Sequence, residues 1–173
     1  LGALGAKASP SVSALVTTLS HDNDYVRVYA AEALASIGPA AARATPALAR
    51  ALNDPAPGVR WAACEALGSI GPAAQSAVPQ LIDALKDEFL YVRIFAAGAL
   101  GNIGPKSQSA RDALRAAARD PTLRDEAEWA LSRIAGSPPD TRAASPVVPS
   151  PAVAAPLETP AVPVGDPPVD WDT

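Results

Sequence analysis

Apolar residues in the segment from residue 24 to residue 53 recur at helical intervals. The first group follows the i, i+4, i+7, i+8, i+11 spacing of one helix face: Val26, Ala30, Ala33, Leu34 and Ile37. Gly38 stands where a left-handed C-terminal cap is needed, and Pro39 cannot continue the helix. A second helix is predicted from Thr45 to Asn53, with Pro46 in its first turn. The pattern therefore predicts two helices joined at a Gly-Pro step.

The same pattern recurs every 33 residues. Three motifs carry the repeat: Val26-Arg27, Val59-Arg60 and Val92-Arg93; Leu34, Leu67 and Leu100; Ile37-Gly38-Pro39, Ile70-Gly71-Pro72 and Ile103-Gly104-Pro105. Partial copies precede and follow the three full ones, and the last copy follows a deletion of two residues. The repeat region is therefore divided into units of about 1–20 (partial), 21–53, 54–86, 87–119 and 120–136 (partial).

Neither helix of a unit can cover its apolar face alone, so neighbouring units must supply the rest. Small residues such as Ala30, Ala63 and Ala96 let adjacent helix axes approach closely. Asp54-Pro55 and Asp120-Pro121 are interpreted as the N-cap and first residue of the next unit's first helix. The sequence thus predicts an all-α, right-handed α-solenoid over residues 1–136. First helices should form the outer surface, and second helices the inner, concave face.

Composition narrows the function classes. Apolar residues make up 49% of the chain but aromatic residues only 5%, which favours close packing of small side chains. No run of about 18 apolar residues exists, so no membrane span is predicted. The net charge of −4 has the wrong sign for a general nucleic-acid binder. One cysteine, Cys64, and one histidine, His21, form neither a disulfide nor a metal site, so no cofactor or metal is expected.

The chain changes character at residue 137. Ten of its nineteen prolines lie between Pro138 and Pro168, and acidic residues outnumber Arg142. Residues 137–173 are therefore predicted to form a disordered, Pro-rich, acidic tail, with Trp171 between two Asp residues as a docking candidate. The other end starts within a helical pattern and lacks Met, so we expect a fragment or processed product. Nothing in the sequence assigns a compartment, and the cytoplasm is only the default.

The segment from Asp87 to Pro105, with its VR, AA, AL and IGP motifs in order, resembles a HEAT-like repeat of the phycobilisome-lyase type. The resemblance covers about residues 1–136 and implies a helical solenoid. Repeats of this type serve scaffolds, adaptors, chromophore lyases and a metal-dependent hydroxylase, so they do not specify a function. The hydroxylases rely on several His-Glu pairs, and this sequence has no His-Glu dipeptide. A bilin lyase or isomerase stays open as an alternative.

Charged residues recur in step with the repeat. Four arginines share one position, namely Arg27, Arg60, Arg93 and Arg124, and three aspartates share another, namely Asp54, Asp87 and Asp120. An anion-binding row is one interpretation. We favour a structural ladder, in which each Arg binds an Asp or a helix C-terminus between units. His21 takes the position of the ladder Asp in the first unit, and no nucleophile accompanies it as a general base would require.

The second-helix face remains as the binding candidate. Its predicted binding residues are Arg43, Arg50, Gln80, Asp83, Lys86, Arg115 and Arg119, with Gln80 in one exposed column with Ala47 and Ala113. Such a mixed surface suits a protein or peptide, for which Arg is a frequent anchor. We therefore expect a non-catalytic interaction scaffold. A bilin lyase-like subunit and a nucleic-acid-binding module are the alternatives. The aromatic side chains of the first helices are expected to pack between units or to cover part of the surface rather than to form a binding cage: Tyr29, Trp61, Phe95 and Trp129. Trp61 is the one to test for binding.

Overall fold

The structure is a computed structural model that describes residues 11–136. Those residues contain helices and no strand. The first helices of successive units are α2 (Asp24–Ile37), α4 (Pro57–Ile70), α6 (Leu90–Ile103) and α8 (Arg124–Ile134). The second helices are α3 (Thr45–Ala51), α5 (Val78–Ala84) and α7 (Arg111–Ala117), and residues 11–18 form a further helix before them.

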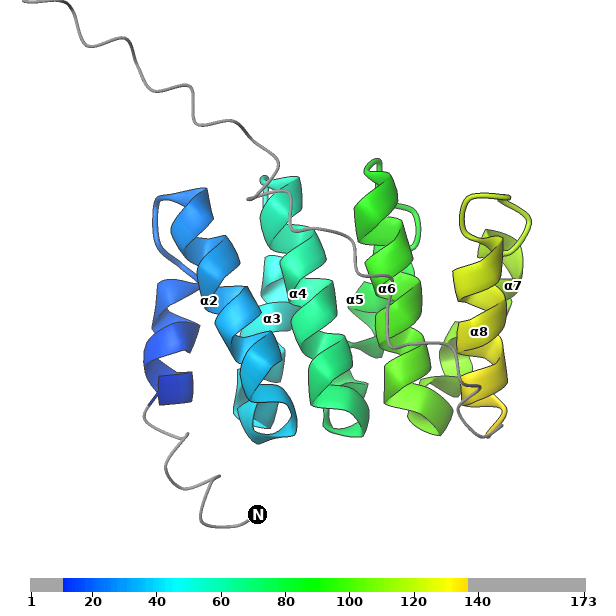
Figure 1. The fold of residues 1–173 in the computed structure, drawn as a ribbon, viewed down its shortest axis with the longest axis horizontal. Helices are drawn as coiled ribbons and strands as arrows, with labels where there is room; N and C mark the ends of the chain where they lie inside the picture. Colours follow the sequence, from blue (N-terminus) through cyan, green and yellow to red (C-terminus); the bar gives the residue numbers. More distant parts are fainter. Residues whose placement is uncertain (1–10, 137–173) are drawn as a thin grey trace, which may run out of the picture.

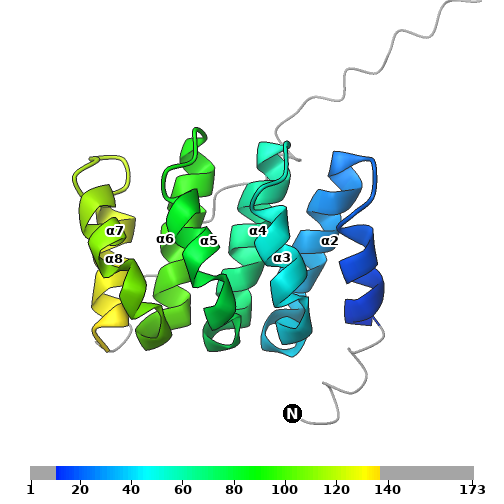
Figure 2. The same ribbon diagram turned by 180° about the vertical axis from the view of Figure 1, so that it is seen from behind.

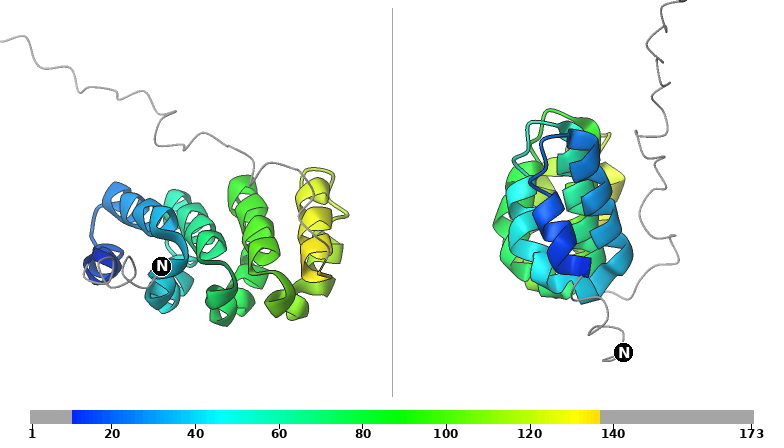
Figure 3. Two further views of the ribbon diagram at one scale, coloured as in Figure 1. Left: turned by 60° about the horizontal axis from the view of Figure 1, so that its bottom comes forward. Right: turned by 90° about the vertical axis from the view of Figure 1, so that its left-hand side faces the viewer.

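The helices lie in two layers. Figure 1 shows α2, α4, α6 and α8 side by side on one face, and Figure 2 shows α3, α5 and α7 on the opposite face. Each first helix contacts the next first helix, and each second helix packs against the first helix of the following unit. Along the stack the pairs lie one behind another and share no central core (Figure 3). The prediction of an all-α, right-handed solenoid is confirmed.

Small residues bring the first helices together. Ala30, Ala63 and Ala96 are at most 2% exposed, and the leucines Leu67 and Leu100 are fully buried. The backbones of α4 and α6 come close at a glycine, since a Cβ built on Gly68 would lie 3.1 Å from the Cα of Ala99. Small residues therefore let the backbones of neighbouring units approach, while buried leucines such as Leu67 and Leu100 supply apolar packing.

Helices α2, α4 and α6 each end at the glycine of a Gly-Pro step, as predicted. Gly38, Gly71 and Gly104 have φ values of 64°, 69° and 68°. Their ψ values near −135° to −139° lie outside the left-handed helical region, in a conformation that essentially only glycine adopts. The chain then continues as a 3₁₀ helix in η1 (Gly38–Ala44), η2 (Gly71–Ala77) and η3 (Gly104–Ala110). The sequence pattern did not predict these segments.

The predicted start of the first helices is wrong. Helix α4 begins at Pro57 rather than Pro55, and the backbone N–H of Ala56 donates to Oδ1 of Asp54 over 2.9 Å. Asp120 accepts in the same way from the N–H of Thr122, also over 2.9 Å. Because α4 begins only at Pro57 and α8 only at Arg124, these hydrogen bonds form turns in the preceding loops and do not cap the helices. The repeated aspartates therefore shape the loop before each first helix.

Candidate functional site

Two junctions between units are joined by paired arginine and aspartate side chains. Arg27 on α2 donates to Asp54 from Nε and Nη2, both over 2.8 Å. Arg60 on α4 donates to Asp87 from the same atoms over 2.7 and 3.0 Å. Nη1 of each arginine donates to two backbone carbonyls in the loop before its own helix. Each guanidinium therefore connects two successive loops, a geometry that arginine's fixed donors allow.

The pairing shifts the pKa values of Arg27, Arg60 and Asp87. The hydrogen bond to Asp87 raises the pKa of Arg60 against the effect of burial, and the hydrogen bond to Asp54 does the same for Arg27. Burial acts to raise the pKa of Asp87, but the Arg60 hydrogen bond and the N–H of Phe89 outweigh it and hold the pKa below its usual value. Both members of the Arg60–Asp87 pair are therefore charged across the neutral range.

The third junction differs from the first two. Arg93 on α6 binds the carbonyls of Asp87 and Glu88 through Nη1, and neither a hydrogen bond nor a salt bridge links it to Asp120 within residues 11–136. Oδ1 of Asp120 instead accepts from the N–H and the hydroxyl of Thr122. Arg124 stands at the first position of α8, whereas Arg93 stands at the fourth of α6, because two residues are deleted here. Arg124 donates through Nε to the carbonyl of Ala118 over 3.4 Å.

Most of the predicted binding residues are exposed, and they lie on or next to the second helices. The exposed ones are Arg43, Arg50, Asp83, Lys86, Arg115 and Arg119. Arg115 donates to Asp112 three residues earlier, over 2.8 Å. Gln80 is only half-buried rather than exposed, and its Oε1 is shielded without a hydrogen-bond partner. The predicted exposed column is wrong at Ala47, which is 7% exposed and faces the core.

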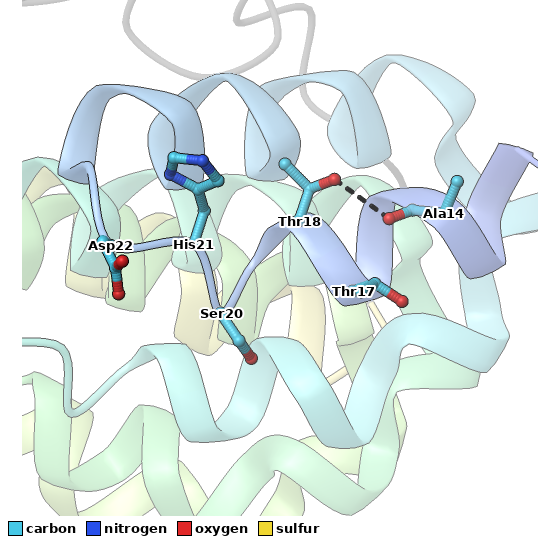
Figure 4. A pocket seen from close by; sticks show the side chains of 6 residues that line it. All are labelled: Ala14, Thr17, Thr18, Ser20, His21 and Asp22. Atoms are coloured by element: carbon cyan, nitrogen blue, oxygen red, sulfur yellow. Dashed lines mark hydrogen bonds between the residues drawn. The ribbon is translucent and has the colours of Figure 1, made fainter.

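His21 lies beside an open hollow of about 610 Å³ before α2. The hollow is lined by residues of the loop and the preceding helix: Ala14, Thr17, Thr18, Ser20, His21 and Asp22. Figure 4 shows the His21 ring and the Asp22 carboxylate pointing in different directions. Nδ1 of His21 accepts from the N–H of Asn23, which is the same turn that Asp54 forms with Ala56. His21 therefore shapes a loop in place of the ladder aspartate.

Aromatic side chains on the first helices serve different contacts. The rings of Trp61 and Phe95 lie 5.3 Å apart and are nearly buried between α4 and α6. Trp129 contacts the α6 backbone at Gly101, so a Cβ there would lie 2.8 Å from its Cε3. Tyr29 is 56% exposed and belongs to the surface rather than to the packing between units. Trp61 carries an indole N–H that is buried and has no hydrogen-bond partner among the described residues.

The sequence analysis missed one exposed cluster, formed by Phe89, Leu90 and Tyr91 at the start of α6. The guanidinium carbon of Arg60 lies 5.4 Å from the centre of the Phe89 ring, within range of a cation–π contact. The corresponding residues of the preceding unit are the small or rigid Ala56, Pro57 and Gly58. The appearance of two aromatic residues and a leucine at these positions of an otherwise regular repeat was the sequence signal that could have revealed the exposed cluster.

Within residues 11–136, no helix has the length and apolar character that crossing a bilayer requires. The same residues hold no group of three or more His, Cys, Asp or Glu side chains placed to bind a metal ion. The predicted tail and its docking candidate Trp171 lie outside the described residues.

Comparison with known proteins identifies the repeat. The model of the HEAT repeats family matches residues 12–87 and 78–148. A solved structure of the CpcE–CpcF complex of phycocyanin lyase from Nostoc sp. PCC7120 is 26% identical, with a TM-score of 0.61, over 75% of this chain and 85% of that one. Two engineered proteins, Northeast Structural Genomics Consortium targets OR329 and OR366, are each 25% identical, with TM-scores of 0.61 and 0.63.

The matches to the two engineered proteins cover 74% and 72% of this chain, and the chain spans just under two thirds of their length, 64% and 63%. The search of curated proteins returned no match.

Proposed function

The chain belongs to the HEAT-repeat family, and from this premise we propose that it is a non-catalytic scaffold whose second-helix face binds a protein or a peptide. The first-helix layer differs from the second in what it does with its charges. The guanidinium groups of Arg27 and Arg60 donate hydrogen bonds to aspartates and to loop carbonyls at the junctions. Among the exposed cations of the second layer, Arg50, Lys86 and Arg119 make no such contact within residues 11–136.

One observation carries the proposal. Arg50 lies in the last turn of α3, and Lys86 and Arg119 follow α5 and α7 in the next two units. All three are exposed, and no side-chain hydrogen bond or ion pair engages any of them within residues 11–136. Two of the three stand at the same repeat position, and Arg50 lies one turn earlier. Exposed cations in a row on a rigid stack suit an extended partner that crosses several units.

A matched pair of variants tests the face. In the first, Arg50→Gln, Lys86→Gln and Arg119→Gln are combined. In the second, exposed serines of the first-helix layer are changed by Ser36→Glu, Ser69→Glu and Ser132→Glu, which alters the net charge by the same amount. The full chain serves as bait in quantitative affinity capture from its source organism.

We expect the Gln variant to lose its specific partners by about tenfold or more, a loss equivalent to about 1.4 kcal/mol, while the Glu variant keeps them. Equal capture by the Gln variant and the unaltered chain would refute a role for this face. Circular dichroism of both variants checks that the helical stack is intact.

A second candidate rests on the likeness to the phycocyanin lyase complex, which spans 85% of that chain. On that reading the chain binds a bilin. Titration with a free bilin separates the two functions, because a protein-binding scaffold leaves the absorbance spectrum of the pigment unchanged. A saturable spectral shift at equimolar protein would replace the scaffold proposal with the lyase-like one.

A further inference from the structure

Charge is divided between the two layers of the stack. Residues 38–53, 71–86 and 104–119, which contain the second helices and the 3₁₀ segments, carry two acids, Asp83 and Asp112, and seven bases: Arg43, Arg50, Lys86, Lys106, Arg111, Arg115 and Arg119. The first helices are nearly balanced. Their bases are Arg27, Arg60, Arg93, Arg124 and Arg133, and their acids are Asp24, Glu32, Glu65, Asp125, Glu126 and Glu128. The second-helix layer is therefore the basic face of the molecule.

The positive charge is densest near the end of the described stack. Four of the seven bases belong to η3, α7 and the residue pair that follows α7. Helix α8 contacts both α7 and η3, and the chain leaves the described region at Gly136, two residues after α8 ends. Whatever follows residue 136 is thus tethered beside the most basic part of the face.

The sequence that follows carries the opposite charge. Residues 137–173 contain Asp140, Glu158, Asp166, Asp170 and Asp172 against the single base Arg142. Asp170 lies 34 residues beyond Gly136, so an extended chain reaches up to about 110 Å, far more than the step from α8 to α7 needs. A tethered segment has an effective concentration in the millimolar range, so weak charge pairing suffices to hold it.

We propose that the segment from Glu158 to Asp172 binds the basic second-helix face of its own chain and competes there with acidic protein partners. This inference rests on the proposed function, and it names the chemistry of the partner: an acidic, extended segment. Trp171 between Asp170 and Asp172 adds an aromatic face for an exposed guanidinium to stack on, so the end of the segment carries the strongest contact.

The experiment uses a spin label at the end of the full chain. The chain has one cysteine, Cys64, which is fully buried, and burial raises the pKa of its thiol far above neutrality. A Thr173→Cys variant is therefore labelled at the new thiol alone. We expect the nitroxide to attenuate the amide peaks of Arg50, Lys86 and Arg119 by more than about twofold, because the tether keeps the segment near the face. The amide peaks of Ser36, Ser69 and Ser132 on the other layer should stay unchanged.

Three controls decide the result. Attenuation should vanish in about 0.5 M NaCl, because exposed charge pairs are screened. It should also vanish when Glu158→Gln, Asp166→Asn, Asp170→Asn and Asp172→Asn are combined. Unlabelled ¹⁵N protein mixed with labelled ¹⁴N protein should show none, since the contact is within one chain.

Attenuation of the first-helix layer, equal attenuation of both layers, or none at all would overturn the proposal, as would attenuation in the mixed sample. The proposed function is judged separately, by partner capture with the Gln variant. If capture depends on the face and the label reports no contact, the scaffold function stands and the tail proposal falls.

Discussion

The junction between α4 and α6 and the junction between α6 and α8 occupy the same place in the repeat but are held by different contacts. At the first, Arg60 and Asp87 form a paired hydrogen-bonded bridge with side chains 10% and 12% exposed. At the second, the Asp120 carboxylate accepts a hydrogen bond from the Thr122 hydroxyl, and α6 and α8 meet where Trp129 contacts Gly101. A repeat can therefore keep its fold after losing the bridge, provided another contact closes the junction.

The difference follows from the deletion of two residues before α8. The deletion places Arg124 in the first turn of α8, and it changes the loop that would present Asp120 to Arg93. Charged ladders need a fixed loop geometry, because a two-hydrogen-bond bridge tolerates little displacement. The contact between an aromatic ring and a glycine has no hydrogen-bond direction to satisfy, so it depends less on the loop geometry. Two pairs of variants and a pH series test this contrast.

The largest effect is expected for removal of the bridge. Asp87→Ala removes the closer of the two carboxylates that pair with the nearly buried Arg60 guanidinium and leaves only the exposed Glu88 at 3.5 Å, so it should lower the free energy of unfolding by about 2–3 kcal/mol. Asp120→Ala removes two hydrogen bonds within its own loop and the charge attraction to Arg93, but no hydrogen-bonded bridge, and should cost clearly less. Urea denaturation of the two variants, monitored by circular dichroism, measures both. Equal losses would show that the two junctions do not differ in this way.

A second pair of variants tests the glycine contact. A Cβ on Gly101 would meet the Trp129 ring and lie 3.0 Å from the Cα of Ala130, so Gly101→Ala should cost about 1–2 kcal/mol. Gly98→Ala on the same helix meets only the end of the flexible Glu126 side chain. That variant should be neutral or stabilising, since alanine favours helix by up to about 1 kcal/mol over glycine. Thermal unfolding compares them, and a stabilising Gly101→Ala would contradict the proposed contact.

Acid should weaken the bridged junction selectively. The pKa of Asp87 is lower in the folded chain than in the unfolded one, so its stabilisation is complete above the unfolded value and is lost as the pH falls through the folded value. The stability difference between the unaltered chain and Asp87→Asn should therefore shrink between about pH 5 and pH 2. Urea midpoints across that range measure it. A difference independent of pH would mean that the Asp87 charge does not stabilise the fold.

Much of the fold could be predicted because its signals are local. The helix face that begins at Val26, the Gly38-Pro39 stop and the spacing of 33 residues each depend on a few neighbouring positions. The 3₁₀ segments were missed because their residues, as in Gly71–Ala77, show no apolar periodicity of their own. Ala47 was placed on the wrong face because α3 buries more than the stripe of Leu48 and Leu52: Thr45, Ala47 and Ala51 are buried as well.

The site was less predictable, because it depends on which loops meet in space. Arginine and aspartate recur in step along the chain, but the repeat does not reveal that Arg60 contacts Asp87 whereas Arg93 does not reach Asp120. The charge of the second-helix layer could be counted from the sequence once the helices were assigned. The exposure of Phe89 could not be predicted in this way, because it depends on how α6 begins.

The smallest effect is expected at Glu65, which lies on the bridged α4 but is not part of its bridge. Burial and, after it, the nearby Glu32 charge raise the pKa of Glu65, so the charged form is held at a cost in the folded chain. A raised carboxyl pKa means that this cost is absent at low pH and grows as the pH rises through the folded value. Glu65→Gln should therefore stabilise the chain at pH 7. The gain should be no more than about 0.5 kcal/mol, because solvent screens the charge of a partly exposed group. Its advantage should disappear near pH 4, the opposite trend to Asp87→Asn. Parallel urea titrations of the two variants separate them, and a destabilised Glu65→Gln at pH 7 would show that this carboxylate has a partner that its charge serves.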